Sequence, residues 1–128
     1  MATFRHEIGI GDARSENFEL VNAWVDTGAL YSQVPASMLE RLGHRPNATR
    51  VFKLADGSTD TLPVGSIPMR LLGEVQPTLF VFAEEDSDPL LGALALEEFG
   101  YKADPVNQIL EPTIAMRLTR LDPEGRQQ

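Results

Sequence analysis

The sequence has no cysteine, so it forms no disulfide bonds, carries no thiol nucleophile and offers no cysteine metal ligand. Basic residues are also few: 11 Lys and Arg stand against 19 Asp and Glu, for a formal net charge of −8. This balance argues against nucleic acid or an anionic membrane as a partner. No apolar run approaches the length that spans a bilayer, and residues 1–12 lack the apolar core of a secretory signal. We therefore expect a cytoplasmic protein.

Patterns that would indicate a metal or cofactor are missing too. His6 and His44 lie far apart, without the spacing of metal ligands. The acidic residues 84–88 lack the alternating oxygen ligands and the glycine of a calcium loop. Ser32 and Ser37 do not lie in a nucleophile elbow, and no Gly-rich phosphate loop is present. We expect no metal site and no cofactor.

The pattern of apolar residues predicts a mostly β protein. A chain of 128 residues suits one domain, and it shows many short alternating or fully apolar segments bounded by turn residues. We expect strands at residues 4–10, 18–25, 30–34, 50–54, 59–64, 68–72, 78–83 and 114–118, and short helices at 36–42 and 93–99. Residues 79–82 are apolar at every position, which predicts burial on both faces. These elements favour a small closed or partly closed β barrel with one or two short helices.

The chemistry of the chain centres on Asp26, Thr27, Gly28 and Ala29, which follow an apolar run and precede another. This context places a carboxylate at the end of a buried strand, on a glycine turn. A carboxylate there is costly unless hydrogen bonds or a functional role compensate for its burial. The alternative is an ordinary turn, because Asp and Gly are common in turns.

Two later segments bear on this choice. Asp56-Gly57 lies between two expected strands and is a strong hairpin signal, although an ordinary surface hairpin would look the same. Leu90, Leu91 and Gly92 then lead into the second expected helix, where plain core packing is the alternative reading.

In this order, the three segments resemble the retropepsin-like aspartic proteases over about residues 18–112. The chain looks closer to small cellular and bacterial single-domain members than to the viral enzymes. The resemblance implies a barrel of the retropepsin type over residues 1–118, followed by a flexible tail at 119–128. It also implies an aspartic endopeptidase that acts on a peptide or protein substrate.

The resemblance further implies a role for each matching residue. Asp26 would be the catalytic carboxylate, Thr27 would hydrogen-bond across a dimer axis, and Gly28 would let the backbone approach the substrate closely. The other implied roles are Ala29 beside the substrate, a flap at Ala55, Asp56, Gly57 and Ser58, support of the turn by Leu90, Leu91 and Gly92, and pocket walls at Leu30, Tyr31, Val64 and Ile67.

The chain departs from the viral pattern at two linked positions. Leu30 and Tyr31 stand where viral relatives carry acidic residues, and Ala93 stands where they carry an Arg that pairs with one of those acids.

The chain carries one Asp-Thr-Gly motif and no internal repeat, whereas the chemistry needs two carboxylates. The second must then be Asp26 of another subunit, in a homodimer with isologous contacts. Two alternatives remain: a dimeric peptide-binding or scaffold domain with the same fold and little or no turnover, and a chain that stays monomeric until a partner assembles it.

Overall fold

The computed structural model describes residues 2–114. The expected strand at 114–118 lies outside these residues except for Ile114, which is not in a strand, and the tail at 119–128 lies wholly outside them. The described chain contains β1 (Ala2–Gly11), β2 (Phe18–Asp26), β3 (Ser32–Pro35), α1 (Ala36–Arg41), β4 (Ala48–Lys53), β5 (Thr59–Leu71), β6 (Glu74–Ala83), β7 (Leu90–Gly92), α2 (Ala93–Phe99), β8 (Tyr101–Asp104) and β9 (Ile109–Pro112).

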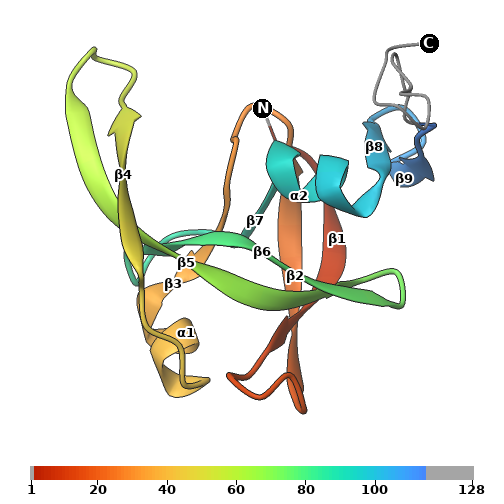
Figure 1. Cartoon of the computed structure of the whole chain (residues 1–128). Coiled ribbons are helices and arrows are strands. Elements are labelled where there is room, and N and C mark those ends of the chain that lie inside the picture. Colours follow the sequence, from red (N-terminus) through yellow and green to blue (C-terminus); the bar gives the residue numbers. More distant parts are fainter. Residues whose placement is uncertain (1, 115–128) are drawn as a thin grey trace, which may run out of the picture.

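Seven strands form one sheet in the order β1-β2-β7-β3-β6-β5-β4, and a short pairing of β1 with β5, the strand next to the other end, closes the sheet. That pairing joins Gly9 to Arg70 and Ile10 to Met69. Closure leaves β4 outside the ring, and the β4–β5 hairpin rises away from the barrel (Figure 1). The prediction of a mostly β, partly closed barrel with two short helices is confirmed.

Alternation along the strands places one face of each strand in the core. In β2, Val21, Ala23 and Val25 are buried while the residues between them are more exposed. The expected burial of residues 79–82 on both faces is confirmed for residues 80–82, while Leu79 is half-buried. Phe80 and Phe82 lie in the main core, and Val81 lies in a smaller cluster on the other face.

Both helices form where the sequence predicted them, and glycines end them. Gly43 follows α1 with φ of 93°, and Gly100 follows α2 with φ of 79°. Such left-handed positions favour glycine and commonly end helices. No helix within residues 2–114 is long and apolar enough to cross a membrane.

The strand predictions were wrong in placing a break at residues 65–67, because Thr59–Leu71 form one continuous strand, β5, and Leu72 lies in the turn after it. Gly65 lies inside this strand, at a position where a side chain would be crowded. A Cβ there would lie 3.1 Å from Cε1 of Phe82 and 3.3 Å from the carbonyl oxygen of Arg45. The prediction also missed the β8–β9 hairpin, whose turn is stabilised by Asp104 Oδ1 accepting the backbone N–H groups of Val106 and Asn107.

Candidate active site

Asp26 ends β2, and a short parallel strand lies directly beside it. β7 pairs with β2 so that Val25 is opposite Leu91 and Asp26 is opposite Gly92. β7 also contacts β3 through the pair Gln33–Leu90. The segment that the sequence singled out near residue 90 is therefore inserted between the strands that enter and leave the turn after Asp26.

The turn holds the Asp26 side chain through its own backbone. The N–H of Gly28 donates to Asp26 Oδ1 at 3.0 Å, and the N–H of Ala29 donates to the Asp26 carbonyl oxygen at 3.2 Å. Partial burial raises the pKa of the Asp26 carboxyl, but hydrogen bonds, including those of Gly28 and Ala29, outweigh it and leave the pKa below its ordinary value. In a single protomer this carboxylate is ionised near neutral pH.

Gly92 is in close contact with the backbone of the same turn. A Cβ on Gly92 would lie 2.6 Å from the carbonyl carbon of Tyr31 and 2.9 Å from the carbonyl oxygen of Leu30. Its N–H donates to the hydroxyl of Ser32, a fully buried side chain, at 3.0 Å. Ser32 therefore has a structural contact here, which sequence reasoning did not find because the donor is far away in the sequence.

The start of α2 is bonded to the turn by main-chain groups. The N–H of Ala93 donates to the carbonyl oxygen of Ala29 at 2.8 Å, and that of Leu94 donates to the carbonyl oxygen of Leu30 at 2.9 Å. These bonds join the uncharged start of α2 to the segment after Asp26 through main-chain groups. Thr27, at the apex, is exposed and borders a pocket of about 300 Å³ between α2 and β8.

The segment 55–58 forms the tip of the β4–β5 hairpin, whose turn is stabilised locally. Gly57 has φ of 89°, a conformation that glycine adopts easily. The N–H of Gly57 donates to the carbonyl oxygen of Leu54, and Asp56 Oδ1 accepts bonds from both the N–H and the hydroxyl of Ser58. These bonds lower the pKa of Asp56.

An aromatic contact attaches this hairpin to the strand after the turn. The rings of Tyr31 and Phe52 meet edge to face, with centroids 5.9 Å apart and an interplanar angle of 82°. Both rings pack on a small apolar cluster that includes Val64 and Val81. The contact holds the hairpin near the end of β4, because Phe52 pairs with Asp60 one step before the last pair, Lys53 with Thr59. The tip beyond it projects from the barrel (Figure 1).

A pocket of about 510 Å³ lies between the turn and the hairpin. Of the four residues expected as pocket walls, Leu30 and Tyr31 line it. The other two are fully buried, Val64 in the small cluster and Ile67 in the main core. Sequence reasoning missed several lining residues from the hairpin and the sheet: Gln33, Arg50, Val51, Phe52, Lys53, Leu54, Leu62 and Val81.

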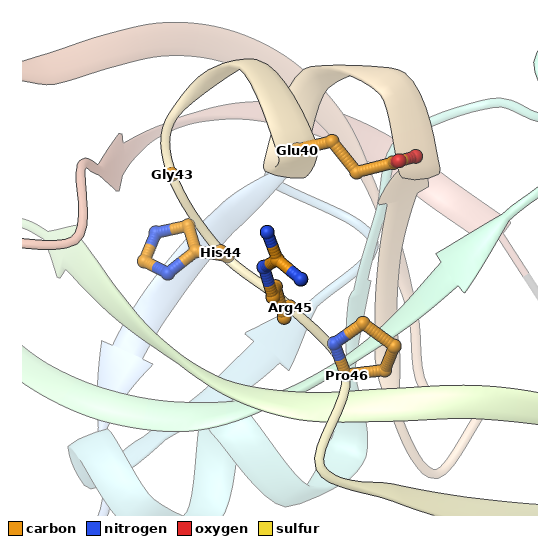
Figure 2. A pocket seen from close by; sticks show the side chains of 5 residues that line it. All are labelled: Glu40, Gly43, His44, Arg45 and Pro46. Atoms are coloured by element: carbon orange, nitrogen blue, oxygen red, sulfur yellow. The ribbon is translucent and has the colours of Figure 1, made fainter.

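A larger pocket, of about 670 Å³, follows α1 and shares no lining residue with the pocket beside the turn; Figure 2 shows its lining residues. It is lined by five residues from one short segment, among them Glu40, His44 and Arg45. The buried His44 is engaged in the fold, because its Nε2 donates to the carbonyl oxygen of Gly11 at 2.7 Å. We place the candidate site at the smaller pocket, which is next to the Asp26 turn. Residues 2–114 hold no group of three or more side chains placed to bind a metal.

No protein-family model matches the chain, and no curated protein matches it. Several solved structures match the chain. The protease of simian foamy virus (mac) is 21% identical to this chain with a TM-score of 0.54, and the match covers 74% of this chain and 93% of the viral one. The retroviral protease-like domain of Ddi1 from Leishmania major has 20% identity and a TM-score of 0.61, covering 88% and 89%. The EIAV protease, complexed with the inhibitor HBY-793, has 19% identity and a TM-score of 0.55, covering 78% and 90%. The chain therefore has a retropepsin-like fold.

Proposed function

We propose that this chain is a homodimeric aspartic endopeptidase, with one catalytic Asp26 from each subunit. The observation that supports this most is the position of Asp26. It ends a core strand, its carboxylate accepts the N–H of Gly28, and its turn borders a pocket beneath a projecting hairpin. The proteases with the same fold give the proposal its reaction class.

The proposed reaction divides two roles between two copies of one residue. Two carboxylates at close range do not both ionise readily, so the pair holds one shared proton and titrates as a unit. The ionised Asp26 takes a proton from a water molecule, whose oxygen attacks the peptide carbonyl carbon. The protonated Asp26 donates its proton to the carbonyl oxygen. The first Asp26, now protonated, gives its proton to the leaving nitrogen. The C–N bond breaks as one hydroxyl of the tetrahedral intermediate gives its proton to the other Asp26, so that the dyad again holds one proton.

The proposal gives the neighbouring segments supporting roles within one domain over residues 1–118. Residues 55–58 act as a flap that closes over an extended peptide and excludes water. Leu90, Leu91 and Gly92 support the turn from below, and the main-chain bonds from α2 fix its exit. Leu30 and Tyr31 contribute apolar walls for substrate side chains.

The test is cleavage of a proteome-derived peptide library by wild type and by Asp26→Asn, from mildly acid to neutral pH. Asn keeps the shape of the side chain and removes the titrating group. Cleavage by wild type alone is the expected result. Equal cleavage by both proteins would remove Asp26 from the mechanism. If neither cleaves while sedimentation shows a dimer, a peptide-binding domain with this fold becomes the better assignment.

Dimer formation is tested separately at Thr27, which is exposed at the apex of the turn. We propose that its hydroxyl hydrogen-bonds to the partner subunit across the twofold axis. Thr27→Ala should then raise the dimer dissociation constant about 5- to 150-fold, because losing one hydrogen bond of about 0.5–1.5 kcal/mol from each of the two subunits costs about 1–3 kcal/mol in total. Sedimentation equilibrium measures this constant. A constant that matches wild type would contradict the role given to Thr27.

A further inference from the structure

The pocket beside the Asp26 turn has a charge opposite to that of the whole chain. Its charged lining residues are Arg50 and Lys53, both from β4, and no Asp or Glu of the described chain lines it. The chain as a whole has 19 acidic and 11 basic residues. A positive pocket on an acidic protein attracts negative ligand groups there and repels them from most other surfaces.

Neither cation is neutralised by a protein carboxylate within residues 2–114. Arg50 donates one N–H to the carbonyl oxygen of Thr49, which leaves its charge uncompensated. Lys53 makes no ion pair in the described chain. The closest acidic residues along the hairpin are Asp56, whose carboxylate binds Ser58, and Asp60, which pairs with Phe52 in the strand register and does not line the pocket.

Apolar side chains lie in the same pocket. Leu30, Val51 and Leu54 line it and are 58%, 68% and 48% exposed, although side chains of this kind are usually buried. They come from both sides of the pocket, Leu30 from the turn and the other two from the hairpin. A ligand that fits both properties has an apolar side chain with a carboxylate next to it.

We propose that Arg50 and Lys53 make this site select peptides in which Asp or Glu adjoins an apolar residue near the cleaved bond. This inference rests on the proposed function, and it names the substrate class of that same site. Lys53 is the main determinant, because it has no other partner in the described chain. An exposed ion pair changes affinity about two- to fivefold, and added salt weakens it.

The experiment uses three fluorescent decapeptides that share a central Leu-Phe and carry Glu, Gln or Lys next to it. Binding is measured by anisotropy with the Asp26→Asn protein, which does not require catalysis. Cleavage of the same peptides is measured with protein that retains Asp26. Each measurement is repeated with Lys53→Glu and with the matched control Arg14→Glu. The control makes the same charge change in the exposed loop between β1 and β2, at the end of the barrel away from the hairpin (Figure 1).

With Lys53 present, we expect the Glu peptide to bind and to be cleaved about two- to fivefold better than the Gln peptide. Lys53→Glu should instead prefer the Lys peptide to the Gln peptide, and Arg14→Glu should keep the preference of the protein without it. Equal affinity for Glu and Gln peptides, no binding of any peptide, or an unaltered preference in Lys53→Glu would each overturn the inference. Binding with the expected preference but no cleavage would overturn the proposed peptidase and leave the ligand class standing. Cleavage of the three peptides at equal rates would overturn the inference about the ligand class and leave the proposed peptidase standing.

Discussion

Replacing Gly92 by Ala should displace the turn that carries Asp26. A Cβ at this position would lie 2.6 and 2.7 Å from the carbonyl carbon and oxygen of Tyr31, and 2.9 Å from the carbonyl oxygen of Leu30. All three are backbone atoms, so no rotation of a side chain relieves the contact. Ordinary contacts begin at 3.4 Å, and the shortest of these distances is about 0.8 Å below that value.

The size of the effect follows from two contributions. Overpacking a well-packed position costs about 1–3 kcal/mol. Loosening the hydrogen bond from the Gly92 N–H to Ser32 adds about 1 kcal/mol. A loss of about 2–4 kcal/mol in the free energy of unfolding lowers Tm by roughly 8–16 °C in a domain of this size. A shift near 1 Å also costs up to about 100-fold in kcat/KM, if the site acts as proposed.

Urea unfolding measures the stability, and amide hydrogen exchange reports on the turn without any need for catalysis. Exchange at Ala93 and Leu94 should accelerate, because their N–H groups are bonded to the carbonyl oxygens of the displaced segment. Gly73→Ala is the control. Gly73 has φ of 84°, and a Cβ added there would meet no atom of the described chain within 4 Å. The control therefore loses about 1–2 kcal/mol through backbone strain alone.

The control should lose stability while Ala93 and Leu94 keep their protection. The reasoning is refuted if Gly92→Ala unfolds within about 0.5 kcal/mol of wild type, the range of an ordinary surface substitution. It is also refuted if Gly73→Ala and Gly92→Ala accelerate exchange at Ala93 and Leu94 equally.

Three further predictions concern neighbouring parts of the molecule. In an isolated protomer, studied at concentrations where the chain is monomeric and no second Asp26 shares a proton, the lowered pKa of Asp26 means that its stabilising contribution is present above the ordinary value of 3.8 and is lost as pH falls through the folded-state pKa. The difference in unfolding free energy between wild type and Asp26→Asn should shrink on acidification below pH 3.8, and a difference that stays constant in acid titrations would contradict this. Phe52→Ala removes the ring contact with Tyr31 and should cost about 1–3 kcal/mol in urea unfolding and lower kcat/KM; unchanged values of both would show that the contact does not hold the hairpin. His44→Ala leaves the carbonyl oxygen of Gly11 without its partner and should cost about 1–3 kcal/mol, with unchanged peptide binding by the folded protein. Lost peptide binding at full stability would instead give the pocket in Figure 2 a functional role.

The sequence predicted the elements whose conformation depends on adjacent residues. Alternating apolar residues were sufficient for β1 and β2, and Gly43 and Gly100 marked the ends of the two helices. The hairpin tip at Asp56-Gly57 could also be predicted from adjacent residues, because its turn is stabilised by its own side chains and backbone. Such signals survive without tertiary context.

Errors arose where a residue type serves packing between distant segments. The break expected between residues 64 and 68 is absent, and β5 continues through Gly65, where the ring of Phe82 crowds the position of a Cβ. Val64 and Ile67 were apolar and suitably placed in sequence for a pocket wall, but both are buried. A strand residue changes face with a shift of one position, so its surroundings depend on the register.

What the sequence determined by itself is the local arrangement around Asp26: a carboxylate at a strand end, on a glycine turn, in a mostly β chain with one copy of the motif. Only the tertiary structure decided what surrounds it. The pairing of β2 with β7 places Gly92 against the turn, and the fold brings Arg50 and Lys53 of β4 to the pocket beside that turn. The physical reason is the separation along the chain of the residues that interact. Turns and alternation arise from neighbouring residues, whereas a pocket is formed by segments that meet only after the sheet has closed and its register is set.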